Sequence, residues 1–313
     1  MAARSPKIRT RYSIGEWYGR PFELMSPKDR VDQAKLEIGT ATLTGLNCPF
    51  QHNRICTKKG GVCSLRKYEQ KGAEGVAGVG PLITTCPNRF LEDNIIFRWV
   101  AETILNTSDP LILRQIGFLD RLRATPPQIE EGDEESDFIG RIDNVLVHPT
   151  TRPIDWCAVE LQAVYFSGKS MSREFGALAA TEQPELTFPA AHRRPDWRSS
   201  GPKRLLPQLE TKVPTIRTWG KKMAVVIDEA FFTSLVGLER ERHLSNAEIA
   251  WFVVGYDLVG TARQLKCRDV IFSKLTSSVT ALTGGVPLPK EKFEAQLQTK
   301  ISLSYPEHRF PKV

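Results

Sequence analysis

The sequence predicts an α/β fold, in which a central mixed sheet is flanked by helices. Apolar runs of strand length recur along the chain, and helical patterns separate or follow them. The expected strands are residues 111–119, 138–147, 156–163, 223–227 and 249–256, and the helices among and after them are residues 231–238, 273–282 and 290–301. Because residues 138–147 and 156–163 follow one another closely, we expect them to pair as antiparallel neighbours.

Two further helices are expected in the N-terminal third. The first covers residues 26–38, where Ser26 can cap the helix, Pro27 suits the first turn and Asp29 can accept unpaired backbone amides. It should end at Gly39. A longer helix is expected over residues 88–105, which place apolar side chains at helical spacing.

Length and composition indicate a globular protein. The chain has 313 residues, 41% of them hydrophobic, which is enough for one large domain or for one domain with an appended module. We divide it into an N-terminal region, residues 1–87, and a core, residues 88–313. No run of about 18 apolar residues and no signal-type leader is present, so we expect a soluble, cytoplasmic protein with no membrane partner.

Charge is separated into blocks along the chain. Residues 1–71 hold 14 basic and 6 acidic residues, and residues 192–222 hold 9 basic and 2 acidic residues. Six acids lie within residues 130–137. The Pro- and Arg-rich stretch around residues 184–222 is interpreted as a basic insertion that contacts DNA. Solvated loops would explain the same charge distribution.

Four of the six cysteines lie between residues 47 and 87, where the sequence shows little periodicity. Their spacing is Cys48-x7-Cys56-x6-Cys63-x22-Cys86. A cytoplasmic chain does not normally keep disulfides, so a tetrahedral thiolate metal site is the favoured interpretation, and scattered free thiols are the alternative. Cys157 and Cys267 are interpreted as structural.

Acidic residues stand on two of the expected strands. Asp143 lies in residues 138–147, and Glu160 and Gln162 lie two positions apart in residues 156–163, where they share one face of the strand. Two such carboxylates, with the Leu161 carbonyl, can hold Mg²⁺ against a phosphodiester. Glu135 is a weak candidate for a further acid, as is Glu102. The structural alternative is that Asp143 and Asn144 end a hairpin and that Glu160 forms a salt bridge with Arg141.

The Asp143 and Glu160-x-Gln162 arrangement resembles the PD-(D/E)xK nuclease signature, with Gln162 where lysine is usual. The fuller pattern resembles a NotI-type (NotI/EagI-like) type II restriction endonuclease. The motifs that carry the resemblance are Cys-Pro-Phe from residue 48, Cys-Pro-Asn-Arg-Phe from residue 86, Gly-Arg-Ile-Asp-Asn from residue 140, Val-Glu-Leu-Gln from residue 159, and Trp-Gly-Lys-Lys-Met from residue 219.

The resemblance implies a prokaryotic homodimer that cuts a GC-rich palindrome, such as CGGCCG or GCGGCCGC, and leaves 5′-phosphate ends. It implies a PD-(D/E)xK core with Mg²⁺ at Asp143, Glu160 and Gln162, and an N-terminal module with a structural iron at Cys48, Cys56, Cys63 and Cys86, zinc being the alternative. It also implies a cognate DNA methyltransferase in the host, which is not a physical partner.

Reading G·C pairs favours arginine or lysine against guanine O6 and N7. The candidates are Lys58, Lys59, Arg66, Lys67, Arg193, Arg194, Arg198, Lys203 and Arg204. Two other functions fit the sequence less closely: a metal-ribbon DNA-binding regulator without catalysis, and a repair or homing-type nuclease.

Overall fold

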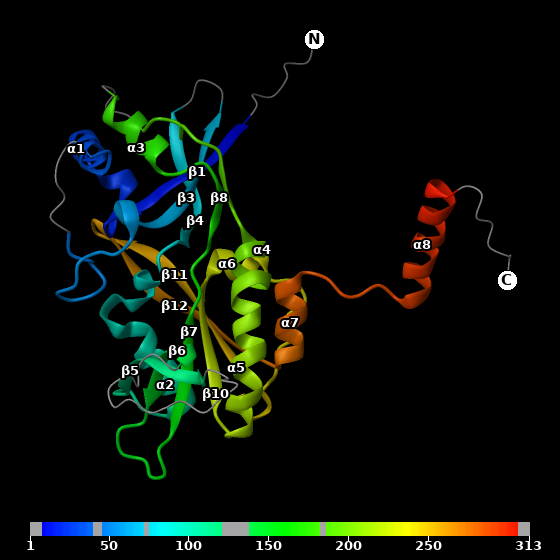
Figure 1. Ribbon diagram of the computed structural model, residues 1–313. Helices are drawn as coiled ribbons and strands as arrows, with labels where there is room; N and C mark the ends of the chain where they lie inside the picture. Colours follow the sequence, from blue (N-terminus) through cyan, green and yellow to red (C-terminus); the bar gives the residue numbers. More distant parts are fainter. Residues whose placement is uncertain (1–7, 40–45, 72–74, 121–137, 182–185, 306–313) are drawn as a thin grey trace, which may run out of the picture.

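The computed structural model describes residues 8–39, 46–71, 75–120, 138–181 and 186–305. Within these residues the protein contains a large sheet and a smaller N-terminal sheet, each with its own helices (Figure 1). Three clusters of buried side chains hold them together, two on the faces of the large sheet and one in the N-terminal part. The expected α/β class is confirmed.

The large sheet is mixed, and its strand order is β12-β11-β10-β7-β6-β5. Its strands are β5 (Leu111–Asp120), β6 (Phe138–Val147), β7 (Trp156–Leu161), β10 (Lys222–Asp228), β11 (Ile249–Val259) and β12 (Ala262–Ser273). β10 runs parallel to both β7 and β11, and the other pairs are antiparallel. All five expected strands are present, and β6 pairs with β7 as expected.

Helices cover both faces of this sheet. On one face α2 (Ile95–Leu105) packs against Val159 and Phe252, and on the other α5 (Leu206–Thr218) and α7 (Leu275–Thr283) pack against Ala158 and Trp251. Since neighbouring residues of a strand face opposite sides, Glu160 lies on the same face as Ala158, which is the α5 face. α6 (Glu229–Ser234) begins at Asp228, whose side chain accepts a hydrogen bond from the Phe231 amide.

The N-terminal sheet has the strand order β2-β1-β3-β4. It consists of β1 (Ile8–Trp17), β2 (Arg20–Pro21), β3 (Val62–Lys71) and β4 (Val76–Thr84). α1 (Pro27–Glu37) begins and ends as expected, because the Ser26 side chain accepts from the Asp29 amide and Gly39 follows with φ of +90°. Residues 47–87 therefore contain two strands of a packed sheet, which the sequence did not predict.

A later segment of the chain completes this N-terminal part. β8 (Phe166–Gly168) pairs with β9 (Arg193–Pro195), and α3 (Ser172–Ala179) packs beside α1. The ring of Phe175 on α3 stacks on Trp17 of β1 at a centroid distance of 5.2 Å. The chain therefore crosses between the two parts of the molecule three times, after β4, after β7 and after β9.

Two expectations are wrong in detail. Residues 88–105 do not form one helix: a 3-10 segment, Pro87–Asn94, precedes α2, and Asp93 and Asn94 break the helical path with φ of 49° and 54°. In the described part of the expected insertion, from residue 186 on, the chain does not stay in a surface loop, because after the short helix α4 (Trp197–Ser200) and a π-helical turn, Gly201–Leu205, it enters α5. α5 buries Leu209, Val213 and Ile216 in the core.

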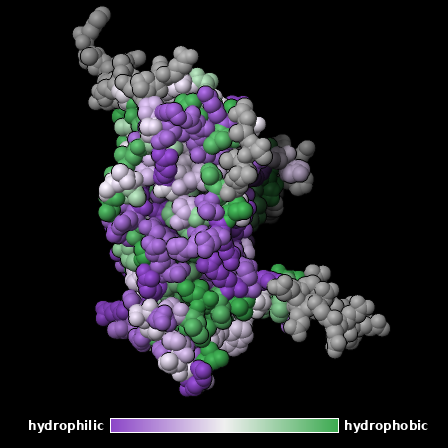
Figure 2. Space-filling view, turned by 90° about the vertical axis from the view of Figure 1, so that its left-hand side faces the viewer, coloured by the Kyte–Doolittle hydropathy of each residue, from purple (hydrophilic) through white to green (hydrophobic). Residues whose placement is uncertain are grey.

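The surface exposes both hydrophilic and hydrophobic residues. The face in Figure 2 shows hydrophilic residues over most of its middle and hydrophobic residues gathered below them. The C-terminal helix α8 (Lys290–Ser304) buries no residue and stands apart from the rest of the molecule (Figure 1). In the described residues no helix is both long and apolar enough to cross a membrane.

Candidate active site

The antiparallel pairing of β6 and β7 brings the two expected carboxylates together. Asn144 pairs with Val159, so Asp143 and Glu160 lie opposite one another one step further along this register. Directly opposed residues of such a pair have Cβ atoms about 4.5–5.5 Å apart. Gln115 of β5 donates a 3.3 Å hydrogen bond to Asp143 Oδ1.

The two carboxylates differ in exposure. Asp143 is half-buried, whereas Glu160 is only 3% exposed. The pKa of Glu160 is raised to about 7, first by burial and next by the neighbouring Asp143 carboxylate, while the ion pair with Lys212 opposes both effects. A buried pair of like charges is unfavourable unless a cation lies with it.

The cation is Lys212 of α5, which the sequence did not single out. Its Nζ lies 2.9 Å from Glu160 Oε2 and 3.2 Å from Gln208 Oε1, one helical turn away. A signal for it exists in the sequence, because Lys212 lies on the same helical face as Leu209, Val213 and Ile216. A lysine on an apolar helix face indicates a buried partner. Pro207 and Pro214 made this segment of the sequence resemble a loop, so the helix was not predicted.

Gln162 lies just beyond the end of β7. Its backbone amide donates to the Val226 carbonyl over 3.0 Å, so the chain still follows the sheet there. Its side chain is buried, and Nε2 donates to the Ala163 carbonyl over 2.5 Å. Gln162 thus lies near the carboxylates, with its amide held against its own backbone.

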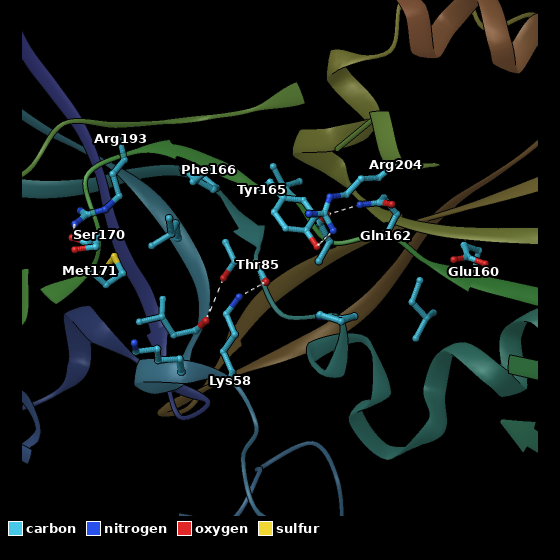
Figure 3. Close-up of a pocket in the computed structure, with 18 of the residues that line it drawn as sticks. Lys58, Thr85, Glu160, Gln162, Tyr165, Phe166, Ser170, Met171, Arg193 and Arg204 are labelled. Carbon is cyan, nitrogen blue, oxygen red and sulfur yellow. Dashed lines mark hydrogen bonds between the residues drawn. The ribbon is translucent and has the colours of Figure 1, made fainter. Parts of the chain in front are cut away.

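A cavity of about 540 Å³ opens between the two parts of the molecule. The large sheet contributes Asp143, Glu160 and Gln162 to its walls, and the N-terminal part contributes Lys58 and Thr85. Figure 3 shows Glu160 and Gln162 on one side of this space, and Ser170, Met171 and Arg193 on the other. Lys58 Nζ donates to the Thr85 carbonyl over 2.7 Å, which fixes its stem at the cavity wall.

Four of the expected DNA-contacting cations line this cavity: Lys58, Lys59, Arg193 and Arg204. Lys169, which was not among the expected residues, also lines it. Arg204 lies 3.7 Å from the centre of the Tyr165 ring and donates to the Tyr165 hydroxyl over 2.6 Å. These side chains make the cavity a basic site around two acids.

Arg193 has a structural role that its sequence context did not suggest. It is 4% exposed, and it donates to Glu174 over 2.7 Å and to the carbonyls of Lys169 and Ser170. It therefore joins β9 to α3 and closes one wall of the cavity. Arg66 is also engaged, since it forms an ion pair with Glu23.

The remaining candidates do not line the cavity. Lys67 pairs with Glu69, and Arg194 contacts Ser167 on the surface. Arg198 and Lys203 lie near α4, outside the cavity wall. Glu135 lies outside the described residues, as does the whole acidic run to which it belongs. Glu102 lies exposed on α2, which covers the opposite face of the sheet from Glu160, so it is not the further acid.

The four cysteines of the N-terminal region come together as two pairs. Cys48 and Cys56 flank a short bridge between Asn47 and Ile55, while the Cys86 amide donates to the Cys63 carbonyl over 3.2 Å. Burial raises the pKa of the Cys56 and Cys86 thiols, and the charge of Cys48 raises each pKa further. In the described residues, however, no three His, Cys, Asp or Glu side chains form a group that could hold a metal ion.

Cys157 and Cys267 differ in their surroundings. Cys157 is fully buried in the core on the α2 side of the sheet, in keeping with the structural role expected of it. Cys267 lies exposed on β12. Neither lines the cavity.

Taken together, opposed carboxylates at the edge of a cavity walled by lysines and arginines are suited to an enzyme that acts on a polyanion. Comparison with protein families supports the same class: the model described as restriction endonuclease NotI matches residues 34–265. The chain therefore belongs to the NotI restriction endonuclease family, whose members are site-specific deoxyribonucleases that bind double-stranded DNA. No curated protein matches the chain.

Proposed function

We propose that this restriction endonuclease cuts double-stranded DNA with a Mg²⁺-dependent PD-(D/E)xK site formed by Asp143, Glu160 and Gln162. The observation that supports this most strongly is the opposition of Asp143 and Glu160 across β6 and β7, at the wall of a basic cavity. Carboxylate oxygens are ligands that Mg²⁺ prefers. A buried Glu160 whose pKa is raised, in part by the neighbouring Asp143, also fits a site that gains a cation in use.

The protein side chains have distinct tasks in this proposal. Asp143 and Glu160 would hold the cation, with the Leu161 carbonyl as a further oxygen ligand. When bound, Mg²⁺ would lower the pKa of water and neutralise charge on the phosphate. Gln162 cannot take a proton, because its amide does not titrate, so it would orient the attacking water or a phosphate oxygen by hydrogen bonding.

The reaction is a hydrolysis at phosphorus. The water oxygen forms a bond to phosphorus, and the bond from phosphorus to the 3′ oxygen breaks. One water proton leaves to solvent, and the departing 3′ oxygen gains a proton. The products are a 5′-phosphate and a 3′-hydroxyl.

We propose a GC-rich palindrome, such as CGGCCG or GCGGCCGC, as the recognition site. A homodimer would match a palindrome, because its two-fold axis presents one active site to each strand. Lys58, Lys59, Lys169 and Arg204 support the DNA-binding part of the proposal because they line the cavity beside the carboxylates. More than half of their contacts should go to phosphate, as in other protein–DNA interfaces. A cognate methyltransferase would protect the host DNA.

We also propose that Cys48, Cys56, Cys63 and Cys86 bind one structural metal ion, iron or zinc. Four thiolates are a suitable ligand set for either ion. The pairwise approach of Cys48 to Cys56 and of Cys63 to Cys86 supports this proposal. The ion would join the loop around Cys48 to the ends of β3 and β4.

Substitution of the two acids tests the catalytic assignment. Asp143→Ala and Glu160→Ala should each abolish cleavage of DNA in Mg²⁺, because each removes a carboxylate from the proposed cation site. Both variants should still bind the DNA that the wild-type protein cuts, which gel shift can measure. Normal cleavage by both variants would refute the assignment. Glu69→Ala, on the surface of β3, is a matched control that should cut normally.

A further inference from the structure

A buried lysine enters the candidate active site from a helix, remote in sequence from the two strands that bear the acids. We propose that Lys212 of α5 is a third charged catalytic residue, which supplies the cation that the strand motif lacks at Gln162. This inference rests on the proposed function, since it assigns a residue to the same site. It concerns a residue 50 positions beyond Gln162 in the chain.

The geometry is specific. Glu160 lies on the face of the sheet that α5 covers, and the Lys212 ammonium lies 2.9 Å from its Oε2. Gln208, one turn earlier on the same helix, accepts a second hydrogen bond over 3.2 Å. An ammonium group has three donors. In the part of the chain that the structure describes, these two acceptors account for two of them, and the third remains for a water or a phosphate oxygen.

Lys212 also faces a space into which a substrate group can enter. A second cavity of about 430 Å³ is lined by Lys212, Asp143, Gln208 and Arg141, among others. Asp143 and Gln208 also line the cavity of about 540 Å³ that contains Glu160 and Gln162. The two spaces therefore meet at Asp143, and Lys212 lies at the junction beside both acids.

A purely structural role explains this lysine less well. Lys212 is 6% exposed and its neighbours on the helix, Leu209, Val213 and Ile216, belong to the core. A buried ion pair contributes little to stability, and apolar residues of similar size often serve as well or better. A charged pair kept at the wall of a cavity is more readily explained by a reaction that builds up negative charge there.

In the reaction Lys212 would keep its proton. Its ammonium would hold Glu160 in place and donate a hydrogen bond to the attacking water or to a non-bridging phosphate oxygen, where negative charge grows as the water oxygen bonds to phosphorus. The proton of the water leaves to solvent, and the 3′ oxygen gains a proton as its bond to phosphorus breaks. Lys212 thus stabilises charge and transfers no proton.

The test is single-turnover cleavage of plasmid DNA that the wild-type protein cuts, measured across a range of Mg²⁺ concentrations. Lys212→Met should lower the cleavage rate at saturating Mg²⁺ by about 10²–10³-fold, as expected for loss of one charge-stabilising donor. Its affinity for the DNA, measured without cleavage in Ca²⁺, should not change. Lys212→Arg should recover part of the rate. Lys221→Met, which removes a lysine paired with Asp155 at the far end of β7, should cut normally.

A structural lysine would give a different pattern. If Lys212 only neutralises Glu160, its loss should lower the Mg²⁺ concentration required and leave the saturated rate unchanged, and that result would overturn the inference. Should Lys212→Met fail to fold, Lys212→Gln keeps a donor without the charge, and a wild-type rate in that variant would overturn the inference equally. Failure of the proposed function itself is distinguishable, because the wild-type protein would then leave the DNA intact, and both proposals would fall.

Discussion

Arg89 joins the two parts of the molecule, and replacing it with methionine should destabilise the whole protein. The residue lies in the 3-10 segment before α2 and is 0% exposed. Its Nε lies 3.0 Å from Glu16 Oε2 on β1, and Nη2 donates over 2.8 Å to the Arg263 carbonyl on β12. The rings of Phe50 and Tyr256 lie on it, each with its centre 4.3 Å away.

The magnitude follows from this burial. Arg89→Met keeps most of the side-chain volume but leaves Glu16, also 0% exposed, as a buried charge with no cation beside it. Removing one partner of a buried ion pair costs about 3–5 kcal/mol. Arg20→Met is a matched control, because Arg20 pairs with Asp29 but is 56% exposed, and exposed pairs contribute about 0–1 kcal/mol.

Urea unfolding followed by fluorescence measures both variants, and the shift in midpoint at constant slope gives the change in the free energy of unfolding. We expect a loss of about 3–5 kcal/mol for Arg89→Met, and recovery of part of it when Glu16→Gln is added. A loss of less than about 1 kcal/mol, equal to that of Arg20→Met, would refute the reasoning. The contact that Arg89 makes between β1 and β12 would then not be needed to hold the two parts of the molecule together around the cavity.

Two further predictions concern the buried carboxyl of Asp228 and the four N-terminal cysteines, which the cleavage assays do not test. Burial raises the pKa of Asp228 from 3.8 to about 6, so the folded state holds the proton of this carboxyl more tightly than the unfolded state does. The stability that Asp228 gives to the fold, compared with Asp228→Asn, is therefore complete below pH 3.8 and is lost as the pH rises through about 6. The difference in unfolding free energy between the two proteins should shift by about 3 kcal/mol between pH 3.5 and pH 7.5, and parallel pH curves would contradict this. Elemental analysis of the purified protein should give about one iron or zinc ion per chain and none in Cys48→Ser/Cys86→Ser, whereas free thiols at all four positions with no bound metal would rule out the proposed metal site.

The sequence predicted the large sheet well because its strands are simple. β6, β7, β10 and β11 are apolar runs buried on both faces or on one, and such runs are distinctive even in a single sequence. The opposition of Asp143 and Glu160 followed from the expected pairing of two neighbouring strands. Local pattern therefore predicted both the sheet and the carboxylate pair.

The N-terminal sheet was missed because its strands carry weak signals. β4 contains Gly78, Gly80 and Pro81, and only its last three residues are buried. β1 is exposed at its start and buried only toward its end. Such strands depend on their partners for stability, and pairing between β1 and β3 joins residues about 50 positions apart. Such a long-range pairing cannot be predicted from the local pattern of a single sequence.

Lys212 was missed for a related reason. Two prolines made residues 184–214 resemble a loop, yet Pro207 lies in the first turn of α5, where it needs no hydrogen bond, and Pro214 is tolerated inside a helix packed firmly on the sheet. The contact between Lys212 and Glu160 exists only once α5 covers the sheet. Arg193 shows the reverse case, since a residue expected on a DNA-contacting surface lies buried against Glu174.

The central claim is that the chain cuts DNA at one defined sequence with the Asp143 and Glu160 site. The most direct test is to digest bacterial genomic DNA with the purified protein and Mg²⁺ and to sequence the fragment ends. We expect all ends to share one GC-rich palindrome and to carry 5′-phosphates, with no cleavage in EDTA. Ends without a common sequence, or intact DNA, would contradict the claim.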